Sequence, residues 1–291
     1  MGLARIVACM LHAPGAMANL IDCMHLGRDR VIAAHEIDGV IVDPGPASTL
    51  EALLAGLRSE PRALLLTHVH LDHAGASGVL VRGFPGLRVY VHEVGAPHLV
   101  DPAKLLRSAE RLYGDQMQRL WGEVAAVPES NVVPLSGGER VEGFRVAYTP
   151  GHANHHVSYL HEATGEAYVG DVAGVRVPPS EFTIPPTPPP DIDVEAWERS
   201  LDAVAAWSPE RLRLTHFGPV DGVEAQLERM RARLRRWSEL AGRGDRDRFL
   251  AEIARETQEA AGEVAERLRQ AAPPEQLWLG LERYWRKRRE A

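Results

Sequence analysis

A regular alternation of short apolar runs and helical spacings is the feature that most constrains how this chain can fold. The runs "GVIVDPG", ending at Gly45, and "ALLLT", beginning at Ala63, have the length and composition of buried strands. Between such runs lie helical spacings over residues 48–58, where Ser48 is the expected N-cap, and over residues 103–126. Strands that alternate with helices predict a layered α/β fold through about residue 219.

The pattern changes after Gly222, where apolar residues recur only at helical spacing. We therefore divide the chain into an α/β domain, residues 1–219, and a C-terminal helical extension, residues 220–291. The extension either caps the core or forms the surface of a homodimer.

Seven prolines between Pro178 and Pro190 predict a stiff loop, because proline fits neither a helix interior nor a regular ladder. This loop and the 103–126 helix lie between segments rich in histidine and aspartate. From that placement alone, we expect both of them, with part of the C-terminal extension, to wall a substrate pocket.

Composition and charge indicate which classes of partner and which cellular compartment to expect. A net charge of −7 gives no general attraction to phosphate, so a nucleic-acid partner is not favoured and a small-molecule substrate is expected. No apolar run approaches the ~20 residues of a membrane span, and the first residues form a poor secretory signal. Cys9 and Cys23 are too few for a disulfide framework and are expected to be buried thiols. These features favour a cytoplasmic protein without a membrane partner.

The run "THVHLDHAG" follows an apolar strand and carries four metal-ligand side chains within six residues. In an extended segment residues i and i+2 face the same way, so His68 and His70 can bind one ion. Asp72 and His73 come where the chain turns into a helix, and they can bind a second ion. Four ligands do not complete two sites, so others must come from elsewhere in the chain.

Three further candidates follow apolar strands: His152 after "AYTPG", Asp171 after "AYVG" and His216 after "LRLT". A residue just beyond a strand can project into a shared rim at the edge of a sheet. Taken singly, each would more often be a turn or surface residue. Together with the histidine cluster, they predict a site of seven metal ligands.

The segments "THVHLDHAG", "YTPGHANHH", "VGDVAG" and "THFG", in this order and spacing, resemble the metallo-β-lactamase superfamily over residues 5–219. The general resemblance is to its hydroxyacylglutathione-hydrolase-like branch, and some segments resemble a poorly characterised prokaryotic branch. The resemblance implies an αββα four-layer sandwich with a dinuclear site at one edge of the sheets. It also implies a ligand set: His68, His70 and His152 on the first metal, Asp72, His73 and His216 on the second, and Asp171 bridging.

The resemblance implies a metal-dependent hydrolase with two divalent ions per chain, most readily zinc, with iron or manganese as alternatives. Two such ions, two carboxylates and one hydroxide leave about one net positive charge, which favours an anionic transition state. A bridging hydroxide would attack an ester-like bond, with thioesters or lactones favoured. Asp72, as a ligand with a spare oxygen, is the expected catalytic residue that passes a proton to the leaving group.

Two rival activities use the same residues differently. A persulfide dioxygenase would hold one iron on His68, His152 and Asp171. A phosphodiesterase or nuclease would need a basic track, for which the face carrying Arg229, Arg233 and Arg236 is the candidate.

Several other polar residues have roles that the sequence leaves open. Asp43 matches a supporting aspartate of the superfamily and equally suits a turn before Pro-Gly. His155 and His156 are not needed to complete the metal set. One of them could orient a ligand or contact the substrate, and a satisfied strand histidine is the simpler interpretation of each. The histidines without a ligand pattern are expected to be structural: His12, His25, His35, His92 and His98.

Overall fold

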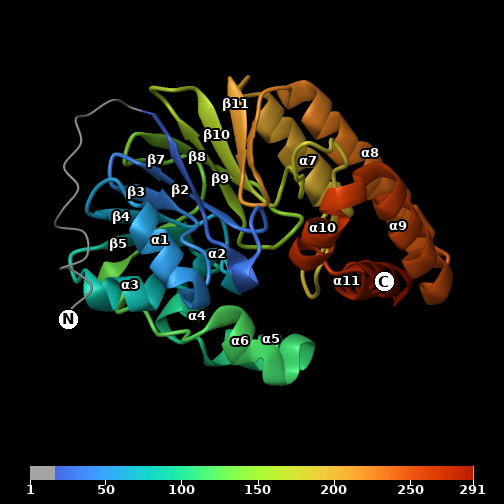
Figure 1. The fold of residues 1–291 in the computed structure, drawn as a ribbon, viewed down its shortest axis with the longest axis horizontal. Coiled ribbons are helices and arrows are strands. Elements are labelled where there is room, and N and C mark those ends of the chain that lie inside the picture. The colour runs from blue at the N-terminus through green and yellow to red at the C-terminus, as the bar shows by residue number, and fades with distance from the viewer. Residues whose placement is uncertain (1–16, 291) are drawn as a thin grey trace.

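The computed structural model describes residues 17–290, which form two six-stranded sheets packed face to face between layers of helices (Figure 1). The first sheet is mixed, with antiparallel pairing at its first three strands and parallel pairing from the third strand to the sixth. Its strands, in spatial order, are β1 (Asn19–Asp22), β2 (Ala33–Ile37), β3 (Val40–Val42), β4 (Ala63–Leu65), β5 (Arg88–His92) and β6 (Val132–Leu135).

The second sheet is mostly antiparallel, and its one parallel pair, β10 with β11, brings two strand ends to the same edge. This edge carries two of the expected ligands. In spatial order its strands are β12 (Gly218–Val220), β11 (Arg211–Leu214), β10 (Glu166–Gly170), β9 (Val157–His161), β8 (Phe144–Tyr148) and β7 (Arg140–Val141).

Strand β4 shows why its sequence is apolar throughout. Successive side chains of a strand point to opposite faces, so Leu65 packs between the sheets while Leu64 packs under the helices of the first layer. Both leucines are fully buried. A strand buried on both faces has no polar side, which is the pattern that predicted it.

Short helices cover the outer face of the first sheet: α1 (Leu50–Gly56), α2 (Leu71–Ala74), α3 (Ser77–Gly83) and α4 (Ala96–Val100). The expected cap at Ser48 is wrong. A 3-10 turn, η3 (Ala47–Thr49), precedes α1, and Thr49 occupies the cap position without a capping side-chain hydrogen bond. Ser48 Oγ instead donates to the carbonyl of Leu120 at 2.6 Å.

The helix expected over residues 103–126 is interrupted. It consists of α5 (Ala103–Tyr113), the 3-10 turn η4 (Gly114–Gln116) and α6 (Met117–Trp121). Gly114 has φ 49° and ends α5, and Gly122 has φ 70° and ends α6. Both glycines take positive φ values that other residues rarely adopt, and helical periodicity alone did not reveal these breaks.

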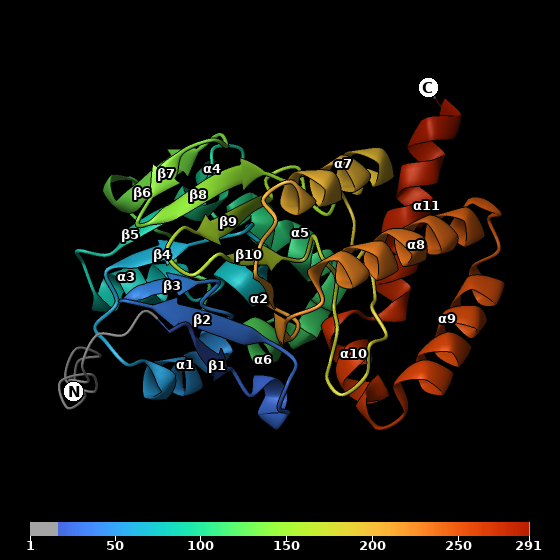
Figure 2. The same cartoon turned by 90° about the horizontal axis from the view of Figure 1, so that it is seen from above.

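The C-terminal helices pack on the outer face of the second sheet beside α7 (Figures 1 and 2). One continuous apolar core joins Val169 and Leu212 of the sheet to Trp197 of α7, Trp237 of α8 and Phe249 of α9. The capping alternative therefore describes this structure, and a homodimer stays a prediction. The helices are α7 (Val194–Ala205), α8 (Val223–Gly242), α9 (Arg246–Ala261), α10 (Ala265–Ala271) and α11 (Pro274–Glu290).

Smaller expectations have mixed outcomes. Asp193 caps α7 by accepting a hydrogen bond from the Ala196 amide, as predicted. The proline-rich segment runs between β10 and α7 without a helix or a named strand, also as predicted. Cys23 is a buried free thiol, while Cys9 lies outside the described residues, as does His12. Over residues 17–290, none of the helices has the length and apolar character needed to cross a bilayer.

Candidate metal centre

All seven expected ligands meet at one edge of the two sheets. They come from segments far apart in the chain, and each follows a strand or begins the short helix after one. The loop after β4 supplies His68 and His70, α2 supplies Asp72 and His73, and the loops after β8, β10 and β11 supply His152, Asp171 and His216.

Three imidazoles form the first group. The Nε2 atom of His152 lies 3.2 Å from His68 Nε2 and 3.0 Å from His70 Nδ1. An imidazole nitrogen offers either one N–H donor or one acceptor lone pair, so His152 Nε2 can form a good hydrogen bond with only one of these two neighbours. Three nitrogens that converge in this way suit a shared cation, and together they form one of the candidate metal-binding groups.

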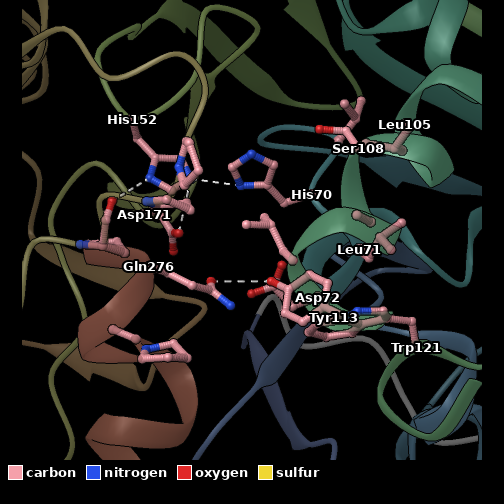
Figure 3. A pocket seen from close by; sticks show the side chains of 18 of the residues that line it. His70, Leu71, Asp72, Leu105, Ser108, Tyr113, Trp121, His152, Asp171 and Gln276 are labelled. Carbon is pink, nitrogen blue, oxygen red and sulfur yellow. Dashed lines mark hydrogen bonds and ion pairs between the residues drawn. The ribbon is translucent and has the colours of Figure 1, made fainter. Parts of the chain in front are cut away.

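The second group contains Asp72, His73 and His216. Asp72 Oδ2 lies 3.3 Å from His216 Nε2 and 3.8 Å from His73 Nε2. Asp171 stands between the groups. Its Oδ2 lies 3.3 Å from His152 Nε2 (Figure 3), and its Oδ1 lies 3.4 Å from His73 Nε2. Its two oxygens therefore reach toward both groups, which is the position that a bridging ligand requires.

Buried atoms without partners test whether this set fits metal ions. Within residues 17–290, His73 Nε2, His216 Nε2 and Asp171 Oδ1 are buried and make no hydrogen bond. An unpaired buried polar atom costs about 1–3 kcal/mol, and three in one place are rare unless something binds them. Imidazole nitrogens and carboxylate oxygens are the ligands that zinc and iron accept, so the residues fit two divalent cations.

The opposite ring nitrogens of these histidines are held by hydrogen bonds. We assign His152 Nδ1–H as the donor to the Pro186 carbonyl at 2.8 Å, and His216 Nδ1–H as the donor to the Val31 carbonyl at 2.6 Å. A proton on Nδ1 leaves Nε2 with a free lone pair directed at the site. The supporting carbonyls thus set both the tautomer and the ring orientation.

Asp43 has the supporting role that the sequence left open. Its carboxylate is fully buried and accepts from His73 Nδ1–H at 2.7 Å, from the Thr67 amide and hydroxyl at 2.8 and 2.7 Å, and from the Thr215 hydroxyl at 2.8 Å. The two threonines lie directly before His68 and His216 in the chain. One carboxylate therefore ties three ligand-bearing segments together.

The charges of the cluster affect the histidines differently. Burial lowers the pKa of His68 and His70, and neighbouring imidazoles lower it further, so both rings are neutral and ready to bind metal. Burial alone would also lower the pKa of His73, but the carboxylates around this ring outweigh burial and raise its pKa well above the usual value. The pKa of His216 rises for the same reason.

His155 and His156, which are neighbours in the chain, have different surroundings. His156 accepts from the Asp171 amide at 3.3 Å and, by assignment, donates from Nδ1 to the Thr149 hydroxyl at 2.9 Å, so it positions the backbone of a ligand. His155 lines the cavity in front of the metal ligands, and its buried Nδ1 has no partner among the described residues. The simple interpretation of a satisfied strand histidine therefore holds for His156 and is wrong for His155.

Gly170 is required immediately before a ligand. Its φ is +47°, and a Cβ there would lie 2.5 Å from Thr67 Oγ1 and 2.8 Å from His156 Nε2. Only glycine combines this backbone conformation with such a close approach. The residue thus lets the end of β10 place Asp171 against the loop that carries His68.

The candidate metal ligands open into a cavity of about 530 Å³ (Figure 3). Its walls come from the segments expected to form them: α5 and α6, the proline-rich loop at Pro186–Asp191, and residues 270–277. The predicted segments thus wall a cavity, and its role as a substrate pocket stays a prediction. Such a volume lies within the range of about 300–1,000 Å³ that is usual for small-molecule pockets.

Some cavity residues were not identified from the sequence. Tyr113 of α5 donates to Gln276 Oε1 of α11 at 3.3 Å, beside Asp72 (Figure 3). His25 and His98, expected to be structural, line the cavity. Helical spacing marks Tyr113 only as a residue of an apolar face, and nothing in the sequence pairs it with a helix 163 positions away.

Comparison with known proteins places the chain in a family. The family model described as the metallo-β-lactamase superfamily matches residues 31–216. A metallo-β-lactamase fold-containing protein of Sulfurisphaera tokodaii, ST1585, is 30% identical over 57% of this chain and 65% of its own length. A hydroxyacylglutathione hydrolase of Thermosynechococcus vestitus is 32% identical over 45% of this chain and 42% of its own length, so the chain spans only part of these relatives.

Solved structures agree on the fold. The crystal structure of ST1585 from Sulfolobus tokodaii superposes with a TM-score of 0.67 at 23% identity, covering 96% of this chain and 100% of that one. The structure of TTHA1623 in a di-iron-bound form has a TM-score of 0.51 at 28% identity and covers 74% of this chain and 96% of that one. The αββα layers, the seven gathered ligand residues and the family match over most of the sandwich lead to one conclusion: the chain belongs to the metallo-β-lactamase superfamily.

Proposed function

We propose that this protein is a hydrolase that uses two divalent ions, most readily zinc, to cleave an ester-like bond of a small molecule, with thioesters or lactones favoured. The observation that carries the proposal is the convergence of seven candidate ligand residues around buried atoms that have no hydrogen-bond partner in the described part of the chain. The relatives named hydroxyacylglutathione hydrolases support a hydrolytic reaction.

Two divalent ions bound in this site would lower the pKa of a shared water toward neutrality and polarise the bond to be cleaved. The chain's own contribution is to hold the ligand atoms in place before substrate arrives. The Nδ1 hydrogen bonds of His152 and His216 keep their Nε2 atoms directed inward. Asp171 sits between both groups of ligands and fixes their separation.

Asp72 is the proposed catalytic residue. Its side chain is 23% exposed and lines the cavity, whereas Asp171 is 5% exposed. Burial would raise the pKa of Asp72, but His73 and His216 outweigh it and keep the carboxylate ionised. A carboxylate at the border between the ligands and the cavity can accept a proton from the nucleophilic water and pass it to the leaving group.

Replacing Asp72 by alanine tests this role. We expect turnover per metal-loaded chain to fall by about 10²–10⁴-fold, the usual contribution of a general acid-base group, while the thermal unfolding midpoint changes little. Steady-state kinetics on thioester and lactone substrates, with metal content measured on the same samples, give the comparison. Unchanged turnover in the loaded variant would refute the proton-transfer role.

The surroundings of the candidate basic face support a small molecule over a nucleic acid as substrate. Arg229 pairs with Glu181, and Arg233 and Arg236 both pair with Glu256. Each guanidinium is already matched by a carboxylate, which weakens this face as a track for phosphates. A panel of thioester, lactone, phosphodiester and persulfide substrates tests the choice, and persulfide oxidation with oxygen uptake would favour the mononuclear iron alternative.

A further inference from the structure

The lining of the cavity is mainly apolar away from the candidate metal ligands. This part, the chamber, is lined by residues of α5, α6, α10 and α11 (Figure 3). Figures 1 and 2 show these helix pairs flanking the same end of the molecule. The apolar chamber walls include Leu105 and Leu112 of α5, Trp121 of α6 and Leu277 of α11.

Charge is scarce in this chamber. Among the described residues that line it, Lys104 is the single lysine or arginine, and it is exposed, as expected at the rim. Asp191 is the single acidic residue of the lining apart from the metal ligands, and burial raises the pKa of its carboxyl group. A ligand with several charges would lose hydration here without gaining matching partners, which is costly.

Hydrogen bonds join the walls of the chamber. Tyr113 donates to Gln276 Oε1 at 3.3 Å, and Gln270 donates to His25 Nδ1 at 3.1 Å and to the His25 carbonyl at 3.0 Å. These contacts join the α5–α6 side to the C-terminal helices. They leave a space in front of the candidate metal ligands that a bound molecule can occupy.

Two buried polar atoms of the lining have no hydrogen-bond partner in the described part of the chain, His155 Nδ1 and the Trp121 indole nitrogen. Neighbouring atoms cover both of them, so neither defines a contact for a ligand. The chamber surface therefore suits a molecule that is mostly apolar and uncharged.

We infer that the substrate is an ester-like compound with an uncharged, mainly apolar acyl body that occupies this chamber, and that Leu105 and Leu112 determine which acyl bodies are accepted. The inference rests on the proposed hydrolase function. It departs from the relatives named hydroxyacylglutathione hydrolases, because a glutathione thioester carries two carboxylates and an ammonium group that these walls do not match.

A series of N-acetylcysteamine thioesters with acyl chains of increasing length tests the inference on the metal-loaded, full-length protein. We expect kcat/KM to rise by up to about fourfold per methylene until the chamber is filled, the gain typical of burying one CH₂ group. The glutathione thioester of each acyl group, measured alongside, is expected to react at least tenfold more slowly.

Variants of α5 link the preference to the chamber. Leu112→Trp fills part of the space, so the ratio of long-chain to acetyl kcat/KM is expected to fall at least tenfold. Leu105→Trp provides a second test if the first variant folds poorly. Leu106→Trp is the matched control: this leucine lies on the same helix with similar half-burial but does not line the cavity, so its ratio is expected to match that of the unaltered protein.

The results of these assays distinguish the inferred substrate preference from the proposed hydrolase function. Hydrolysis that ignores acyl length, or prefers the glutathione thioesters, would overturn the inference and leave the hydrolase proposal standing. An equal loss of the ratio in Leu106→Trp and Leu112→Trp would also overturn it. Absence of hydrolysis with every thioester and lactone in the metal-loaded protein would overturn both.

Discussion

At the scale of single residues, the buried carboxylate of Asp43 connects the segments that carry the candidate ligands, because it accepts hydrogen bonds from His73, Thr67 and Thr215. His68, His70 and Asp72 stand close together in the sequence, and a dense cluster of ligand types after an apolar strand is rare enough to notice. The hydroxyls of Thr67 and Thr215, which donate to Asp43, belong to residues that are common after strands. Their role depends on three-dimensional contacts between segments far apart in sequence.

Asp43 gives the first prediction at this scale. In Asp43→Asn the side chain keeps its size but loses its charge. Its amide nitrogen would face N–H or O–H donors where a carboxylate oxygen of Asp43 now accepts their hydrogen bonds. We expect divalent-metal affinity to fall by about 10–100-fold, the usual effect of losing a residue that orients a ligand. Competition with a chromophoric chelator measures it, and an affinity equal to that of the unaltered protein would contradict the assigned role.

The pKa directions predict how metal binding depends on pH. Since nearby carboxylates raise the pKa of His73 and that of His216 in the metal-free protein, both rings bind protons up to a higher pH than a free imidazole, and a metal must displace those protons. Affinity is therefore expected to increase with rising pH across the neutral range, and binding should release protons. Calorimetry in buffers of different ionisation enthalpy counts these protons, and a pH-independent affinity without proton release would contradict the prediction.

At the scale of helices and strands, the elements that could be predicted from sequence were those with a clear pattern of burial. Strands such as β4 are buried on both faces, and α7 has both an apolar face and a capping aspartate, so local sequence was sufficient. The segment over residues 103–126 was predicted as a single helix because its apolar spacing continues through Gly114, where the backbone takes a positive φ. Helical periodicity reports which side faces the core but does not reveal such a break.

Gly170 provides the prediction at this scale. In Gly170→Ala the new Cβ would press on Thr67 and His156, so both the free energy of unfolding and metal affinity should decrease. Gly262→Ala is the matched control, because Gly262 has φ +51° and a Cβ added there would have no heavy atom within 4 Å. The control should lose only the left-handed cost of about 1–2 kcal/mol. Equal thermal shifts and equal metal affinities in the two variants would contradict the role given to Gly170.

At the scale of the whole molecule, the order of segments along the chain predicted which of them wall the cavity, but not which residues bond across it. The proline-rich loop, α5–α6 and residues 270–277 wall the cavity as expected from their placement between ligand segments. The hydrogen bonds between its walls, one between Tyr113 and Gln276 and one between His25 and Gln270, join segments that no sequence pattern pairs. The division at residue 219 stays a prediction, because the C-terminal helices share one apolar core with the second sheet.

The central claim is that the seven ligand residues hold two metal ions in each chain. Elemental analysis of the protein purified without added chelator, with zinc, iron and manganese all measured, tests it most directly. We predict about two divalent ions per chain, and about one in His216→Ala, which removes a ligand of the second group while leaving the three imidazoles of the first. A single iron per chain in the unaltered protein, together with oxygen uptake on a persulfide, would contradict the two-metal account.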